Sequence, residues 1–254
     1  MRLALAQVRA GADIGRVVAR AASEGAALVL FPESFSNGHA WDGDRAAWLA
    51  GAESLEDGPI ASAYAEAAVR SGIHVAGTLL ERSAGRLYNA AAIWGSGGDV
   101  LLHQRKRHIC FFDAPEDALT AGEGSPAADL QTPEGPVRVG MMICMDREYP
   151  GPAADLAQAG AEIILVPNAC PLVEDAEVGD VRVAGVRGLA FGHAVAVAVA
   201  NYPEGGAGDG RSFCVDARGH LVAMAGPGEE MLMADIDLGA LRDRRRREWF
   251  RHGS

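Results

Sequence analysis

Three side chains that lie far apart along this sequence could together attack an amide bond. Glu33 follows the apolar run Leu28–Pro32, Cys144 follows the apolar run Val139–Ile143, and Lys106 comes just after a third strand-like run. Ligands of α/β proteins gather at the carboxyl ends of strands, so these side chains could line one pocket. The sequence therefore predicts a cysteine nucleophile, a carboxylate base and a cation at a single site.

Each of these side chains has a use in acyl transfer. The thiolate is the nucleophilic form of cysteine, and the Glu33 carboxylate could take the proton of Cys144. The Lys106 ammonium could stabilise the oxyanion on the attacked carbonyl, with the backbone N–H of Met145 as a second donor. Lys106 is the single lysine among 23 basic residues, which indicates a position where a guanidinium is unsuitable.

Composition narrows the classes of protein that this chain could be. Its 254 residues include 23 Lys and Arg against 34 Asp and Glu, which gives a net charge of −11 and argues against nucleic acid as the main partner. No apolar run approaches the ~18 residues of a membrane span, and the N-terminus lacks a secretory signal, so we expect a cytoplasmic protein. Four widely spaced cysteines favour reduced thiols over a disulfide framework.

The elements that must position the site alternate between strand and helix. Several strand-like runs are continuously apolar, which is typical of strands buried on both faces of an α/β protein. No inter-domain linker interrupts residues 1–254, so we predict one domain, with a long irregular segment from Phe112 to Pro136. Helices are expected near 13–25, 59–71, 152–159 and 181–191, and strands near 3–8, 27–31, 73–80, 87–94, 100–102, 137–143, 162–166, 194–200, 213–215, 221–223 and 231–236.

Three short segments resemble the signature segments of the nitrilase superfamily of carbon–nitrogen hydrolases. They are Phe31-Pro32-Glu33, Arg105-Lys106 and Cys144–Pro150, in the order and near the spacing of that family. The resemblance begins at Leu3–Gln7 and continues through Gly160–Pro167, Ala200-Asn201 and Gly210–Ser212, so it covers nearly the whole chain.

The resemblance implies a fold and an activity. The fold is a four-layer αββα sandwich of two mixed β-sheets flanked by helices, usually assembled into homodimers or larger homo-oligomers. The activity is cleavage of small non-peptide amides, nitriles or carbamoyl compounds without a cofactor or metal, with Glu33 as base, Cys144 as nucleophile and Lys106 as stabiliser. Members often carry a second glutamate before the cysteine; Glu116 is the best match here, with Asp117 and Glu123 as alternatives.

Departures from the family pattern bear on the substrate. True nitrilases resemble Cys-Trp-Glu at the nucleophile, whereas Cys144-Met145-Asp146 is closer to the amidase and carbamoylase branches. Gly151 and the pair Gly192-His193 replace residues that the family usually has as Glu and Glu-Asn. The triad is intact despite these changes.

Further residues could line the pocket or bind a partner. Tyr149, Asn168, Cys170, Arg147 and Phe35 are candidate substrate-binding residues, and Arg147 could either hold a substrate carboxylate or form a surface ion pair. The seven histidines show no metal-ligand spacing. The run of arginines at 244–247 is expected to be a solvated helix face or a subunit contact.

Three functions remain open on the sequence alone. The leading one is a thiol hydrolase that cleaves a small non-peptide amide through a cysteine thioester. The same triad could serve an N-carbamoyl amide hydrolase or an acyltransferase that passes the thioester to an amine. A non-catalytic ligand-binding protein with a relict triad is the third, because a cysteine after a strand is more often an inert apolar side chain.

Overall fold

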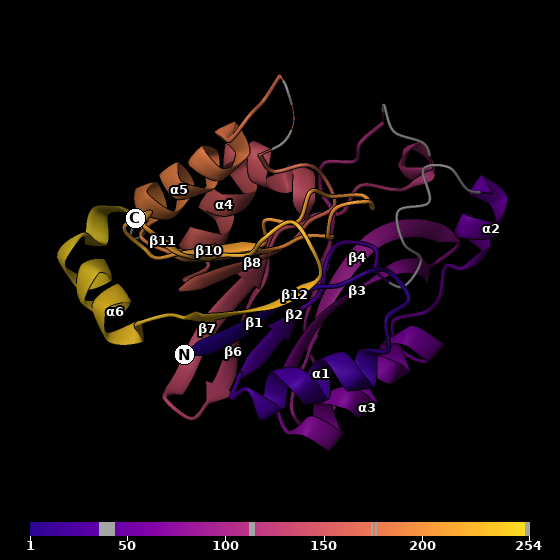
Figure 1. Cartoon of the computed structure of the whole chain (residues 1–254), viewed down its shortest axis with the longest axis horizontal. Coiled ribbons are helices and arrows are strands. Elements are labelled where there is room, and N and C mark those ends of the chain that lie inside the picture. The colour runs from indigo at the N-terminus through magenta and orange to yellow at the C-terminus, as the bar shows by residue number, and fades with distance from the viewer. Residues whose placement is uncertain (36–43, 112–114, 174, 176, 252–254) are drawn as a thin grey trace.

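The computed structural model describes residues 1–35, 44–111, 115–173, 175 and 177–251, and these form four layers (Figure 1). Two six-stranded sheets pack face to face, and helices cover the outer face of each. The expected four-layer αββα sandwich is confirmed.

The first sheet has the strand order β12-β1-β2-β3-β4-β5. Its strands β1, β2 and β3 run parallel, and the others pair antiparallel. The carboxyl ends of β2 and β5 lead directly to Glu33 and Lys106. The bounds are β1 (Arg2–Gln7), β2 (Leu28–Leu30), β3 (His74–Ser83), β4 (Arg86–Trp94), β5 (Val100–Arg105) and β12 (Glu230–Asp235).

The second sheet has the order β11-β10-β9-β8-β7-β6, with β7, β8 and β9 parallel. Cys144 follows β7, and Asn168 and Cys170 follow β8. The hairpin expected between β10 and β11 is confirmed. The bounds are β6 (Ala127–Thr132), β7 (Gly135–Met141), β8 (Ile163–Pro167), β9 (Ala196–Ala200), β10 (Phe213–Val215) and β11 (Leu221–Met224).

Strand β6 corrects the expectation of an irregular segment from Phe112 to Pro136. It pairs antiparallel with β7 at the edge of the second sheet. Only Leu130 of this strand is buried, and its neighbours are exposed or half-buried. An edge strand with one buried side chain lacks the apolar run by which the other strands were recognised.

The helices begin and end where the sequence places its capping residues. The Asp13 carboxylate accepts a hydrogen bond from Arg16 N at 2.8 Å, Pro59 begins the second long helix, and Gly72 ends it at φ +67°. The helices are α1 (Ile14–Ser23), α2 (Arg45–Ala50), α3 (Pro59–Ser71), α4 (Pro150–Gln158), α5 (Val181–His193) and α6 (Leu238–Arg247), with short 3₁₀ turns η1 (Glu116–Ala118), η2 (Cys144–Glu148) and η3 (Trp249–Arg251).

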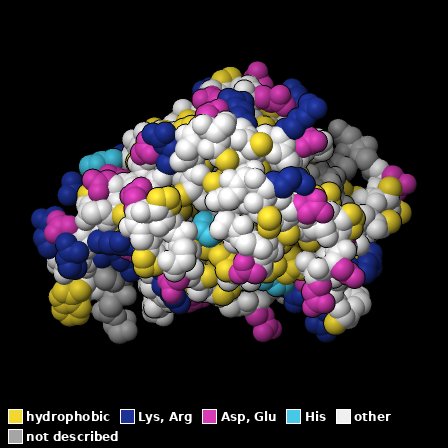
Figure 2. Space-filling model, turned by 90° about the horizontal axis from the view of Figure 1, so that it is seen from below, with side chains coloured by type: hydrophobic (Ala, Val, Ile, Leu, Met, Phe, Trp, Pro, Cys, Tyr) yellow, Lys and Arg dark blue, Asp and Glu magenta, His cyan; other side chains and the backbone are white. Residues whose placement is uncertain are grey.

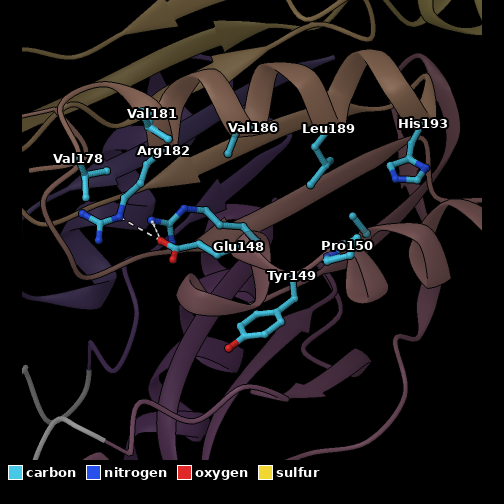
Figure 3. A pocket seen from close by; sticks show the side chains of 12 residues that line it. Glu148, Tyr149, Pro150, Val178, Val181, Arg182, Val186, Leu189 and His193 are labelled. Atoms are coloured by element: carbon cyan, nitrogen blue, oxygen red, sulfur yellow. Dashed lines mark hydrogen bonds and ion pairs between the residues drawn. The ribbon is translucent and has the colours of Figure 1, made fainter.

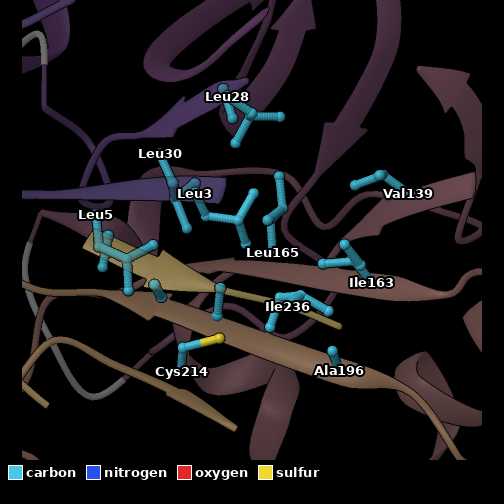
Figure 4. Close-up of a cluster of buried hydrophobic side chains, with 14 of the residues drawn as sticks. Leu3, Leu5, Leu28, Leu30, Val139, Ile163, Leu165, Ala196, Cys214 and Ile236 are labelled. Carbon is cyan, nitrogen blue, oxygen red and sulfur yellow. The ribbon is translucent and has the colours of Figure 1, made fainter. Parts of the chain in front are cut away.

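The largest core lies between the two sheets (Figure 4). There Leu3 and Leu30 of the first sheet pack in one cluster with Ile163 and Leu165 of the second, all fully buried. Alternate residues, such as Val29, point to the outer layer of α1 and α3. Because both faces are covered, the strands need no polar side, which accounts for their continuous apolar runs.

The arginine run in α6 is only partly the solvated helix face that the sequence predicts, because Arg246 and Arg247 are exposed, whereas Arg244 and Arg245 are not. Arg244 is buried; it donates to the carbonyl oxygen of Ala217 and, at 3.0 Å, to that of Phe191. Arg245 donates to the carbonyl oxygen of Ala161 at 2.8 Å. Arg244 and Arg245 thus bind backbone carbonyls of α5 and of two loops of the second sheet, which gives them a structural role.

The face seen from below in Figure 1 carries acidic and basic side chains interspersed with apolar ones (Figure 2). The described part of the chain contains no helix with the length and hydropathy needed to cross a membrane.

Candidate active site

The structure brings Glu33, Lys106 and Glu116 together in a buried ionic cluster. Lys106 Nζ lies 2.8 Å from Glu33 Oε1, and 2.7 Å and 2.9 Å from the two carboxylate oxygens of Glu116. The Lys106 side chain is only 1% exposed. Two strand ends and the turn η1 thus place two carboxylates on one ammonium.

Asn89 completes this cluster, and the sequence analysis missed it. Its Nδ2 donates to Glu33 Oε1 and to Glu116 Oε1, at 2.8 Å each. It lies on β4 in the run Leu87–Trp94 and is fully buried. An asparagine inside an otherwise apolar strand was the available signal, because a buried amide must find partners.

Only Glu116 of the three candidate loop acids reaches the cluster. Its Oε2 also accepts a hydrogen bond from Cys110 N at 2.9 Å, which fixes the carboxylate from the backbone. Asp117 instead pairs with Arg45 at 2.8 Å near the surface. Glu123 lines a separate pocket beside Arg86.

The electrostatics of the cluster keep Lys106 charged. Burial alone would lower its pKa, but the charges of Glu33 and Glu116 raise the pKa of Lys106 well above its usual value. Lys106 is therefore a fixed cation, suited to holding negative charge and unsuited to exchanging protons.

Cys144 occupies a strained turn at the end of β7. Its φ is +45°, a left-handed value that a residue with a side chain rarely adopts. Such strain costs on the order of 1–3 kcal/mol and persists where surrounding contacts enforce it. The turn starts η2, whose first N–H groups, including that of Met145, have no partner within the helix.

The carboxylate of Asp146 holds this turn against the chain that follows Lys106. It accepts hydrogen bonds from Ile143 N at 3.0 Å, Arg107 N at 3.1 Å and His108 N at 2.8 Å. His108 Nδ1 lies 2.9 Å from the same carboxylate. One buried aspartate thus ties the nucleophile segment to the lysine segment, a link that no local sequence pattern predicts.

The Cys144 thiol is 6% exposed and lies within electrostatic reach of both Glu33 and Lys106. Its pKa is raised well above the ordinary value by a hydrogen bond with Cys170, by burial and by the charge of Glu33, while Lys106 acts in the opposite sense. The resting nucleophile is therefore a thiol, which must give up its proton as it attacks.

Arg147 lies beside the nucleophile rather than at the surface. Its side chain is 1% exposed; Nη1 donates to Cys144 O at 2.7 Å and lies 3.8 Å from Cys144 Sγ. Its Nη2 contacts Cys170 Sγ at 3.2 Å and Glu148 at 3.3 Å. The alternative of a surface ion pair is wrong, because this guanidinium is buried.

Asn168 positions Cys170 next to Arg147. The buried Asn168 amide donates to Cys170 O at 3.3 Å and to Cys170 Sγ at 3.5 Å, and it also donates to Asn201 Oδ1 at 3.0 Å. A hydrogen bond with Cys144 and the charges of Arg147 and Arg182 lower the pKa of Cys170 to about 6. Cys170 is thus a thiolate near neutral pH.

Two other candidate substrate-binding residues lie in different settings. Tyr149 is 40% exposed and stacks on the His108 ring, with 3.8 Å between ring centroids. Phe35 is buried against Phe31 in the core between the first sheet and its helices, and its pocket role stays a prediction.

A pocket of about 570 Å³ opens beside Arg147 (Figure 3). Glu148 bridges Arg147 and Arg182 at one end, and apolar residues of α4 and α5, such as Val186 and Leu189, form the rest. Its lining does not include Glu33, Lys106 or Cys144. This hollow is adjacent to the ionic cluster and distinct from it.

Sequence comparisons bear on the family of this chain. The sequence profile described as carbon–nitrogen hydrolase matches residues 12–246. The protein called "Hydrolase in pqqF 5'region" of Pseudomonas protegens is 34% identical over 215 residues, covering 83% of this chain and 71% of its own. Omega-amidase NIT2 of Mus musculus is 30% identical over 237 residues, covering 89% and 82%.

Solved structures show the same fold. Nit3 of Saccharomyces cerevisiae, a member of branch 10 of the nitrilase superfamily, has a TM-score of 0.82 and 24% identity, covering 98% of this chain and 94% of that one. The amidase of Nesterenkonia sp. AN1, in a complex with butyramide, has a TM-score of 0.78 and 26% identity, covering 100% and 97%.

Proposed function

This chain belongs to the carbon–nitrogen hydrolase family and is an amidase-like hydrolase of carbon–nitrogen bonds other than peptide bonds, and we propose that it acts through a thioester on Cys144. We propose a small aliphatic amide as its substrate. The observation that carries the proposal is the buried ammonium of Lys106 between two carboxylates, within electrostatic reach of the Cys144 thiol.

The first half of the reaction forms the thioester. Glu33 takes the proton of Cys144 while the sulfur attacks the amide carbonyl carbon, and the carbonyl oxygen becomes an oxyanion. Lys106 and the backbone N–H of Met145 stabilise that oxyanion. The C–N bond then breaks, and the leaving nitrogen takes the proton from Glu33, so the amine or ammonia departs neutral.

The second half releases the acid. A carboxylate of the cluster takes a proton from water, the hydroxide attacks the thioester carbon, and the C–S bond breaks. The sulfur regains its proton and the product leaves as a carboxylic acid. Glu116 supports this cycle because it keeps the ammonium anchored while Glu33 gains and loses a proton.

Amidase relatives support a small substrate. One relative is an omega-amidase, and one neighbour is an amidase whose structure holds butyramide. A short aliphatic amide is also small enough to suit a nucleophile that is only 6% exposed.

Ammonia release from a panel of short amides, carbamoyl compounds and nitriles tests the proposal. We expect hydrolysis of at least one amide, and a loss of activity of at least about 10³-fold in Cys144→Ala. The matched control is Cys214→Ala, which removes a buried thiol between the sheets, away from the cluster. Transfer of the acyl group to added hydroxylamine in preference to water would indicate an acyltransferase, and full activity in Cys144→Ala would contradict the mechanism.

We also propose that the protein forms homodimers through the apolar groove between α4 and α5. The groove exposes Val181, which is 63% exposed, and Tyr149 next to buried apolar residues. Light scattering during gel filtration should give twice the chain mass, and Leu189→Arg should reduce it to the monomer. A wild-type monomer at micromolar concentration would contradict this proposal.

A further inference from the structure

Two sulfur atoms share one buried guanidinium next to the nucleophile. Arg147 Nη1 lies 3.8 Å from Cys144 Sγ, and Nη2 lies 3.2 Å from Cys170 Sγ. The two nitrogens belong to one rigid planar group, so both sulfurs lie against the same guanidinium. The two thiols are also close enough that each shifts the pKa of the other.

We propose that Cys170 is an oxidation site, at which hydrogen peroxide or an organic hydroperoxide drives a reversible disulfide with Cys144 and so switches the nucleophile off. The proposal rests on the proposed function for its effect on activity, although the disulfide itself does not depend on that function.

Cys170 has the properties of a thiol that reacts with peroxide. Its hydrogen bond with Cys144 and the charges of Arg147 and Arg182 lower its pKa to about 6, so it is ionised near neutral pH. It is also partly exposed, unlike Cys144. Oxidation by peroxide follows thiolate character and access, and a sulfenic acid condenses readily with a neighbouring thiol.

Hydrogen peroxide accepts the two electrons that the two thiols lose when they form a disulfide. The Cys170 thiolate attacks one peroxide oxygen, the O–O bond breaks, and the leaving hydroxide takes a proton to become water. Cys144 then gives its proton to Glu33, as in catalysis, and its sulfur attacks the sulfur of the Cys170 sulfenic acid. The S–O bond breaks, the S–S bond forms, and the second water leaves. The two sulfurs lose two electrons, which reduce one peroxide to two waters.

The other thiols of the chain provide an internal contrast. Burial raises the pKa of Cys110 to about 12, and it does the same for Cys214. Cys110 contacts Met145 Sδ at 3.3 Å and Lys106 Nζ at 3.5 Å, so it is near the site but is not ionised. If closeness to the site alone decided, Cys110 could also form a disulfide with Cys144. We expect Cys170 to be the partner because it is the ionised thiol.

Non-reducing mass spectrometry of the peroxide-treated protein tests the inference. We expect a loss of about 2 Da and a peptide that links residue 144 to residue 170. Activity on the preferred amide should fall at least about tenfold and return with dithiothreitol. Cys214→Ala should behave like the wild type in both measurements, since it lies outside the site.

Cys170→Ser separates the disulfide from simple damage to the nucleophile. Normalised to its own starting activity, this variant should form no cross-link and should gain about 16 or 32 Da at Cys144, with the 32-Da product not restored by thiols. Separate oxygen adducts on the two cysteines of the wild type, or a link from Cys144 to Cys110, would overturn the proposal. If no amide is hydrolysed, the mass measurement still decides it, and the failure then belongs to the proposed function alone.

Discussion

Two ion pairs begin at adjacent residues at the end of β5, and they differ in burial, in geometry and in the balance of charge. Arg105 makes a two-pronged contact with Glu81, at 2.8 Å and 2.5 Å. Lys106 contacts Glu33 and Glu116, at 2.8 Å and 2.7 Å. The first pair has the features of a structural link, and the second has those of a chemical site.

In the Arg105 pair, one guanidinium faces one carboxylate. The fork of the guanidinium faces both oxygens of Glu81, its central carbon lies 3.8 Å from the centroid of the Tyr88 ring, and His103 Nε2 donates to Glu81 at 2.9 Å. Burial alone would raise the pKa of Glu81, but the hydrogen bonds from Arg105 and His103 lower it to about 2. One positive and one negative charge cancel, so the group has no reason to exchange a proton at neutral pH.

The Lys106 cluster is unbalanced. With both carboxylates ionised it carries one more negative than positive charge, so it can accept one proton and keep an ion pair. A lysine presents its charge at a single atom that contacts two carboxylates at once and leaves room for a third group. We infer that the two-pronged Arg105–Glu81 pair stabilises the fold. The Lys106 ammonium, which two carboxylates share, instead prepares a site for proton transfer.

The largest effect on activity is expected from replacing each of the two cations by the other type. In Lys106→Arg the planar fork cannot meet Glu33, Glu116 and an oxyanion together, so we expect kcat/KM to fall about 10²–10³-fold. The reciprocal variant, Arg105→Lys, should keep activity within about threefold. Steady-state kinetics on the preferred amide measures both. Equal losses in the two variants would show that position, not cation shape, separates the pairs.

Asn89→Ala should give the next largest effect. Removing the amide that donates to both glutamates leaves their position less fixed, so we expect kcat to fall about 10–10²-fold with KM nearly unchanged. The pH profile of kcat/KM should shift as well, because Asn89 contacts the ionisable groups. Asn89→Ser, which keeps a donor, should restore part of the activity. A loss of thermal stability with unchanged kcat and pH profile would instead make Asn89 purely structural.

Glu81→Gln addresses the structural pair and should affect stability rather than rate. The Glu81 pKa is about 2 in the folded protein against about 4.3 when unfolded. Its ionised form therefore stabilises the fold fully above about pH 5, and this contribution is lost as pH falls toward 2. We expect Glu81→Gln to lower the free energy of unfolding by roughly 2–3 kcal/mol at pH 7, and the difference from the wild type to shrink in acid. Urea unfolding at several pH values measures it; a difference independent of pH would contradict this assignment.

The smallest effect is expected from Asp117, next to Glu116 in the sequence. Asp117 forms an ion pair with Arg45 in which both side chains are more than a third exposed. Such pairs contribute about 0–1 kcal/mol, so Asp117→Asn should leave both stability and rate nearly unchanged. Glu116→Gln is the matched comparison, and its kcat should fall clearly. A similar fall in Asp117→Asn would show that the loop acid has been misassigned.

The sequence predicted those features that depend on residues close together in the chain. Continuous apolar runs and capping residues located most strands and helices, and polar residues directly after those runs located Glu33, Lys106 and Cys144. The residues it missed act across the fold: Asn89 reaches two loops from within a strand, and Asp146 ties two strand ends together. Choosing Glu116 over Asp117 also required the turn that aims one side chain inward, which local pattern does not specify.

The most direct test of the account is the mass of the enzyme during turnover of a slowly hydrolysed amide. Rapid acid quenching followed by intact-mass and peptide analysis should show the acyl group on Cys144, with none on Cys170, even though Cys170 has the lower pKa. This outcome is expected because Cys144, unlike Cys170, lies within electrostatic reach of both the Glu33 base and the Lys106 cation. An acyl group on Cys170 would contradict the central claim. Continued hydrolysis of the amide by the Cys144→Ala variant would contradict it as well.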